Sequence, residues 1–120
     1  MAKSIPSVLV FDIETVPDVA GLRRLESYPA TLSDAEVVQQ VTEKRLAAGS
    51  SEFLPLYLQK IVAISCVIRR STKEGLPQFK VGSLGQIGDD EKTIITAFYE
   101  LIEKYTPQLV SWNGSGFDLP

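Results

Sequence analysis

Two short acidic segments hold the residues that could do chemistry in this chain, and each directly follows an apolar run. The first spans residues 12–15 (DIET) and the second spans residues 113–118 (NGSGFD). Because side chains alternate along a strand, Asp12 and Glu14 are expected on one face, roughly 7 Å apart at Cβ. At an effective dielectric of about 20 their repulsion is on the order of 2 kcal/mol, which a bound cation would remove.

Carboxylates are the strongest candidates for catalysis here, because the chain contains no histidine. That absence removes Ser-His-Asp and Cys-His nucleophilic machinery and the usual histidine-containing zinc sites from these residues. Asp12, Glu14 and Asp118 offer hard oxygen ligands suited to Mg²⁺ or Mn²⁺. Two such ions about 4 Å apart can activate water and stabilise a leaving oxygen, so the acids predict phosphoryl-transfer chemistry. Asn113 and the glycines after it would let backbone approach a phosphate, and Phe117 could stack on a terminal base.

Length and composition predict one globular domain, since the chain has 120 residues of which 44% are hydrophobic. The net charge of −3 provides no broad basic field, so it neither supports nor excludes a nucleic-acid partner. Cys66 lies in an apolar stretch and is expected to be a small buried side chain, not a reactive thiol. No signal peptide or membrane-spanning run is recognisable, which favours a cytoplasmic protein without a membrane partner; the oligomeric state stays open.

Hydrophobic periodicity and capping signals predict the order of helices and strands. The expected elements are strands over 7–13, 61–68, 79–84 and 109–112, a short helix around 19–25, a helix between Ser33 and Gly49, and a helix capped by Asp89 or Asp90 that ends before Pro107. The first strand is expected to be fully buried and the second to be central in the sheet. Capping explains the acids at 89–91 better than metal binding does. Trp112 is expected to pack in the core or against a strand, with base stacking as the lesser alternative.

This order predicts an α/β fold with a mixed sheet. Residues 17–57 form a helical insertion after the first strand, and the next two strands are joined as an antiparallel hairpin. The crossover helix then permits the fourth strand to run parallel to the first. Such a topology sets the first and fourth strands side by side, with both acidic segments at one edge.

The FDIET segment at residues 11–15, together with Asn113-x-x-x-Phe117-Asp118, resembles the first and second motifs of the DEDD (DnaQ-like) 3′-5′ exonucleases. The likeness is strongest to the proofreading domain of family B DNA polymerases and its stand-alone PolB-like relatives. It implies a ribonuclease H-like fold and hydrolysis of nucleotides from nucleic-acid 3′ ends, single-stranded DNA ahead of RNA, by two Mg²⁺ or Mn²⁺ ions. It also implies that Asp12, Glu14 and Asp118 are catalytic metal ligands, with Thr15, Asn113 and Phe117 at the substrate.

The resemblance departs from the family pattern at the third motif, which would be Tyr-x-x-x-Asp or His-x-x-x-x-Asp on a later helix and would supply a fourth carboxylate. The sequence ends at Pro120 without it. We therefore expect residues 1–120 to be the N-terminal part of a single exonuclease domain, lacking its C-terminal helices and weakly active or inactive alone. The Asp-x-Asp-x-Thr phosphatase motif fails, because Glu14 is not Asp and Thr15 follows it directly. A non-catalytic ribonuclease H-like module that binds nucleic acid or protein is the alternative.

Overall fold

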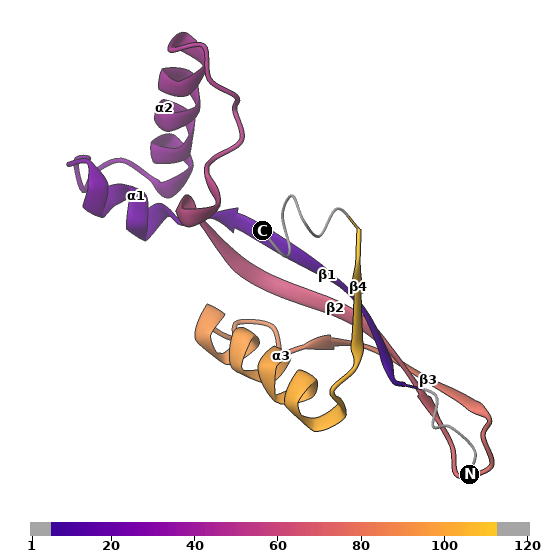
Figure 1. Ribbon diagram of the computed structural model, residues 1–120. Helices are drawn as coiled ribbons and strands as arrows, with labels where there is room; N and C mark the ends of the chain where they lie inside the picture. Colours follow the sequence, from indigo (N-terminus) through magenta and orange to yellow (C-terminus); the bar gives the residue numbers. More distant parts are fainter. Residues whose placement is uncertain (1–5, 113–120) are drawn as a thin grey trace. The chain divides into compact units, whose positions relative to one another are not determined.

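The chain folds into helices and strands that make two compact units, and a computed structural model describes residues 6–112 (Figure 1). The elements are β1 (Val8–Pro17), α1 (Val19–Leu25), α2 (Asp34–Ala47), the 3-10 turn η1 (Leu56–Leu58), β2 (Gln59–Ser71), β3 (Pro77–Leu84), α3 (Glu91–Tyr105) and β4 (Gln108–Ser111). Residues 15–60 form one unit, called the helical unit below, and the described residues on either side form the sheet unit. Both β1 and β2 contribute residues to each unit.

The sheet has four strands in the order β3-β2-β1-β4. β1 and β4 are parallel, with Val8 opposite Gln108 and Phe11 opposite Ser111. β2 and β3 form an antiparallel hairpin. The predicted mixed sheet is therefore confirmed, including the hairpin, the central position of β2 and the fourth strand parallel to the first. This α/β arrangement is consistent with a ribonuclease H-like fold.

The core of the sheet unit lies between α3 and one face of the sheet. Its buried residues are Leu9, Phe11, Ile64, Ile68, Ile94 and Phe98. Apolar residues recur three and four positions apart along α3, which gives this helix the single apolar side that such packing needs. The sheet face opposite α3 is open among the described residues, where Val10 is 44% exposed and Val81 is 75% exposed. The expectation that the first strand is buried on both faces is therefore wrong.

β1 is longer than predicted and runs to Pro17 instead of ending at Ile13. Its extension accompanies an early start of β2, its neighbour in the sheet, at Gln59. The strand end is then closed by a hydrogen bond from the Asp18 amide to the Leu58 carbonyl, 2.8 Å long. Asp12 and Glu14 consequently lie within the strand, where an extended backbone holds them, and not beyond its end.

The helical unit follows its capping signals closely. The Ser33 hydroxyl accepts a hydrogen bond from the Glu36 amide, and the Glu36 carboxylate accepts one from the Ser33 amide, which completes the predicted capping box of α2. Gly49 follows the helix with φ of +80°, a conformation that glycine adopts without strain. Ion pairs join Arg23 to Asp34 and Lys44 to Glu26 across the unit, at 3.0 and 2.9 Å.

The ends of α3 also agree with the sequence. Asp90 is the N-cap, because its carboxylate accepts a hydrogen bond from the Thr93 amide at 2.8 Å. Thr106 adopts a left-handed conformation with φ of 39°, and Pro107 follows it, so the helix ends where predicted. Within residues 6–112, no helix combines the length and apolarity needed to span a membrane.

Candidate metal and substrate site

Asp12 and Glu14 lie on the same face of β1, as their spacing predicts. Burial alternates along the strand, with Leu9 and Phe11 buried and Val10, Asp12 and Glu14 exposed. Since α3 covers the face that carries Leu9 and Phe11, the two carboxylates point to the open face of the sheet. The core beneath β1 thus supports the strand while leaving both acids accessible to an ion or substrate.

The parallel strand β4 ends beside Asp12. Its last residue, Ser111, is the register partner of Phe11, and Trp112 follows it directly. Parallel strands end at the same edge of a sheet, so this pairing sets the end of β4 beside Phe11, the residue directly before Asp12. Asn113, Phe117 and Asp118 themselves lie outside the described residues.

A hollow of about 490 Å³ opens beside Asp12 on the sheet unit. Asp12 and Trp112 line one part of it, and the middle of the hairpin, through Cys66, Val67 and Val81, lines another. Most residues that line the hollow are apolar, and Asp12 provides its single carboxylate. Such a lining suits a ligand that has both an apolar ring and a charged group. A hollow of this size next to Asp12 has room for part of a substrate.

Trp112 is 91% exposed, so the expectation that it packs in the core is wrong. The indole follows a strand of only four residues and has no element above it among those described. The sequence did contain the relevant signal, since Trp112 stands between the apolar run and the second acidic segment. An exposed indole beside a hollow can stack on a flat ring, which an indole buried in the core could not do.

Thr15 is engaged within the helical unit. Its hydroxyl donates a hydrogen bond to the Gln59 side-chain carbonyl at 2.5 Å, and the Gln59 amide donates to the Leu54 carbonyl at 2.6 Å. The Thr15 side chain is partly buried, whereas Asp12 and Glu14 are exposed. These bonds give Thr15 a structural task at the end of β1, and its expected contact with substrate stays a prediction.

The acids that precede α3 each have a structural partner. The Asp89 carboxylate accepts from the Gln86 amide at 2.6 Å, and the Glu91 carboxylate accepts from the Ile61 amide at 2.5 Å, which ties the start of α3 to β2. Hydrogen bonding to Thr93 lowers the pKa of Asp90. The capping prediction is therefore confirmed for Asp90, whereas Asp89 closes the preceding turn and Glu91, the first residue of α3, bonds to β2.

Burial raises the pKa of the Cys66 thiol, which lines the hollow on β2. A raised pKa keeps more of the thiol protonated near neutral pH, and the protonated form is the poorer nucleophile. Cys66 also packs partly against the core. The residue behaves as the small apolar side chain that its surroundings in the sequence suggested.

Whether a divalent metal ion can bind at Asp12 depends on how many carboxylates lie close enough to ligate it. Asp12 and Glu14 provide oxygen ligands from alternate positions of one strand, which is the donor type that Mg²⁺ and Mn²⁺ prefer. Over residues 6–112, no group of three or more His, Cys, Asp or Glu side chains lies close enough to hold an ion. Among the described residues, Asp12 and Glu14 are therefore the two carboxylates available on this face of β1.

Comparison with known proteins gave one family. Residues 51–120 match a family described as predicted 3′-5′ exonuclease related to the exonuclease domain of PolB. The matched segment is more than half of the chain and contains Asn113, Phe117 and Asp118, but it does not reach Asp12 or Glu14. Comparisons with curated proteins and with solved structures found no match.

Proposed function

Because the chain belongs to the family of predicted 3′-5′ exonucleases related to the exonuclease domain of PolB, we propose that it acts on nucleic-acid 3′ ends as a metal-dependent nuclease. The observation that carries this proposal is the placement of Asp12 and Glu14 on one exposed face of β1, beside the end of the parallel strand β4. The sequence that follows β4 contains Asp118, a third carboxylate for the same edge of the sheet. The proposed substrate is a single-stranded DNA end in preference to RNA.

In this proposal Asp12, Glu14 and Asp118 hold Mg²⁺ or Mn²⁺, two ions in a complete site. When bound, the ions would supply the positive charge that activates a water molecule and stabilises the leaving oxygen of the phosphodiester. The chain's own part is to keep the first two carboxylates on a strand whose opposite face is anchored in the core. Rigid placement matters because misplacing a catalytic group by about 1 Å can cost on the order of a hundredfold in rate.

Substrate positioning is assigned to the hollow beside Asp12 and to the three residues that the resemblance to the DEDD exonucleases implies at the substrate. Asn113 and Phe117 are proposed to contact the terminal nucleotide. Thr15 is proposed to contact it as well, after its hydroxyl gives up the hydrogen bond to Gln59 and bonds to the substrate instead. Trp112, which is exposed and lines the same hollow, adds a surface on which a base can stack. Stacking tolerates every base, so it suits an enzyme that removes nucleotides one after another.

The first test is binding of Mn²⁺ by the full chain, followed by nuclear magnetic resonance. The paramagnetic ion should broaden the amide resonances around Asp12 and Glu14 before any others. Asp12→Asn should raise the concentration of Mn²⁺ needed by about tenfold or more, because one charged ligand is lost. Glu100→Gln, which removes an exposed acid of α3 from the same unit, is the matched control and should leave the titration unchanged.

The second test is degradation of single-stranded DNA labelled at its 5′ end. We expect metal-dependent shortening from the 3′ end that Asp12→Asn or Asp118→Asn abolishes and Glu100→Gln does not affect. Broadening that starts elsewhere than Asp12, combined with shortening that survives Asp12→Asn, would rule out the proposed site.

A non-catalytic module is the second candidate function, and the open sheet face favours it. Phe79 and Val81 on β3 are 63% and 75% exposed, and Val110 on β4 is 43% exposed. Apolar side chains gathered on one sheet face are typical of surfaces that bind another macromolecule. In that case Asp12→Asn would leave nucleic-acid binding intact and no metal-dependent shortening would be seen with any variant.

A further inference from the structure

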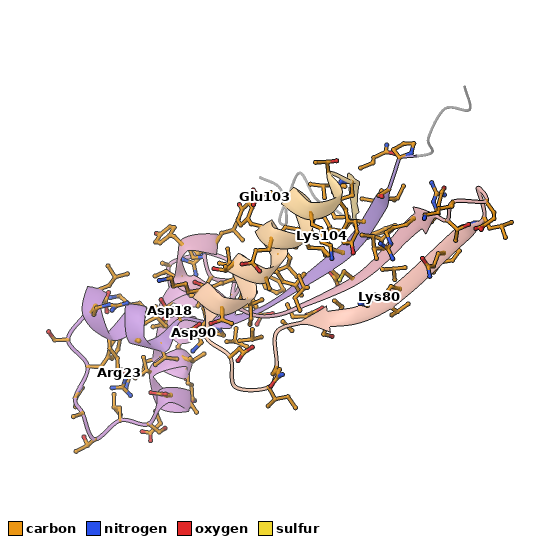
Figure 2. All side chains as sticks on the ribbon, turned by 90° about the horizontal axis from the view of Figure 1, so that it is seen from below. Asp18, Arg23, Lys80, Asp90, Glu103 and Lys104 are labelled. Atoms are coloured by element: carbon orange, nitrogen blue, oxygen red, sulfur yellow. The ribbon has the colours of Figure 1, made fainter. Side chains whose placement is uncertain are left out.

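Two cations from different elements contact one phenol in the sheet unit, and a third cation lies on the same face of the sheet. Arg70 on β2 and Lys104 on α3 each place their charged group 5.0 Å from the centre of the Tyr105 ring. The charge of Lys80 on β3 also acts on the Tyr105 hydroxyl. Figure 2 labels Lys80 on the hairpin and Lys104 near the C-terminal end of α3. We call Arg70, Lys80, Lys104 and Tyr105 the Tyr105 cluster.

The strand register brings the cationic residues of the hairpin to the same face. Lys80 is directly opposite Ile68, and directly opposite residues of an antiparallel pair share a face. Arg70 lies two residues after Ile68 and so shares that face as well. Because Ile68 is buried in the core under α3, this is the face that α3 covers. The Tyr105 cluster is thus separate from Asp12 and Glu14, which lie on the open face.

Arg70 is held in a defined orientation by two hydrogen bonds. One terminal nitrogen donates to the Tyr105 hydroxyl at 3.4 Å, and the other donates to the Gln78 side-chain carbonyl at 3.3 Å. A guanidinium carries five N–H donors, so these bonds leave others available. Its planar fork matches two oxygens of a phosphate group, and prior orientation lowers the entropy lost when such a contact forms.

The ion pairs Arg23–Asp34 and Lys44–Glu26 both belong to the helical unit and involve no member of the Tyr105 cluster. Hydrogen bonding to the Lys104 ammonium lowers the pKa of Tyr105, and the positive charges of Arg70 and Lys80 act in the same direction. Three like charges near one phenol create a local positive potential that an anion would relieve.

A purely structural role explains only part of this arrangement. Lys104 lies in the last turn of α3, where a cation interacts favourably with the negative end of the helix dipole. The helix dipole does not explain the positions of Arg70 and Lys80, because these two residues belong to the hairpin and not to α3. Convergence of three elements on one point is a better match to a bound anion than to helix stabilisation.

We propose that the Tyr105 cluster binds a backbone phosphate of a single-stranded nucleic acid. The identity of the anion rests on the proposed function, which makes a nucleic-acid strand the substrate. A chain with a net charge of −3 has no general attraction for such a strand, so a local group of cations is needed to hold it. The cluster would hold the strand apart from the carboxylates that act on its 3′ end.

The test measures binding of a fluorescently labelled single-stranded oligonucleotide by anisotropy, in EDTA so that no metal ion contributes. The test variant carries Arg70→Gln and Lys104→Gln. The matched control carries Arg69→Gln and Lys92→Gln, which remove the same charge from the same two elements but lie outside the cluster. We expect the test variant to weaken binding about tenfold and to reduce the slope of log K against log salt by about 0.7 per lost phosphate contact. Equal weakening by both variants would mean general electrostatic attraction and would overturn the proposal.

Two further measurements keep the interpretation clear. Arg70→Lys retains the charge but not the fork, and should weaken binding by less than Arg70→Gln while unfolding at a similar temperature. Inorganic phosphate is titrated in parallel, and resonance shifts at Tyr105 with phosphate but not with the oligonucleotide would refute a nucleic-acid partner. If the Tyr105 cluster does not bind nucleic acid, Mn²⁺ should still bind at Asp12. If Asp12 and Glu14 do not form a nuclease site, the oligonucleotide should still bind in EDTA. The failure of one proposal can therefore be told from the failure of the other.

Discussion

Phe11 on β1 packs against Phe98 on α3, with ring centroids 5.0 Å apart and ring planes inclined at 57°. Because successive side chains of a strand point to opposite faces, this contact directs Asp12 to the open face of the sheet. The position of the first candidate ligand thus depends on a core contact made by its neighbour in the sequence. The packing of Phe11 and the orientation of Asp12 are linked because the two residues are adjacent in β1.

Phe98→Ala should therefore be among the most destabilising substitutions in the sheet unit. Removing a buried phenylalanine is expected to lower the free energy of unfolding by about 3 to 5 kcal/mol, through lost burial and the cavity left behind. Urea denaturation followed by circular dichroism measures the change. Tyr99→Ala is the control, since Tyr99 is 64% exposed and should cost less than about 1 kcal/mol. Equal losses from the two variants would mean that α3 does not bury this side.

Thr15→Val should destabilise the helical unit, because the Gln59 carbonyl would lose its partner at the end of β1. The expected loss is about 1 kcal/mol in the free energy of unfolding. Thr15→Ser keeps the hydroxyl and should restore most of it. Hydrogen exchange at the Asp18 amide, which bonds to Leu58, reports on the same strand end. A substitution that changes nuclease activity without changing stability would instead favour the substrate role of Thr15.

Ser33→Ala should loosen the first turn of α2 by removing one half of the capping box. Loss of a serine N-cap typically costs about 1 kcal/mol, because helix amides are left without an acceptor. Faster hydrogen exchange at Glu36 and its neighbours would report the change directly. Ser50→Ala, beyond the end of the helix, is the control and should leave those amides as they were. Unchanged exchange in Ser33→Ala would show that α2 does not depend on this cap.

Asp90 should make folding sensitive to acid. Hydrogen bonding to Thr93 lowers its pKa below the ordinary value of 3.8. A carboxyl whose pKa is lower in the folded state stabilises that state above the unfolded pKa, and this stability is lost as pH falls through the folded pKa. Asp90→Asn can still cap the helix but does not titrate, so its thermal midpoint should fall less than that of the wild type between about pH 5 and about pH 3. Parallel pH profiles for the two proteins would contradict this assignment.

Local signals in the sequence were sufficient for the helices. Ser33 and Glu36 form the predicted capping box, and Asp90 caps α3, because a cap involves residues only three positions apart. The apolar residues of α3 likewise recur at helical spacing, and Ile94 and Phe98 are buried as that spacing requires. The order of strands followed from the hairpin and the crossover helix, which leave few ways to arrange four strands.

Long-range pairing decided what the sequence could not. The sequence predicted that the first strand ends at Ile13, yet β1 continues to Pro17, beside a neighbouring strand β2 that begins at Gln59. Trp112 reads as a core residue by type, but it is exposed because no described element lies over it. The gathering of cations around Tyr105 could not be anticipated either, since it joins residues more than thirty positions apart.

The sequence by itself determined that Asp12 and Glu14 share one face of β1, because alternation along a strand is a local property of the backbone. Only the tertiary structure decided which face that is. α3 packs on the face of β1 that carries Phe11 and leaves the face that carries Asp12 open. The face that α3 covers is set by contacts between segments distant in the chain, and a local sequence pattern does not show which residues those contacts bury.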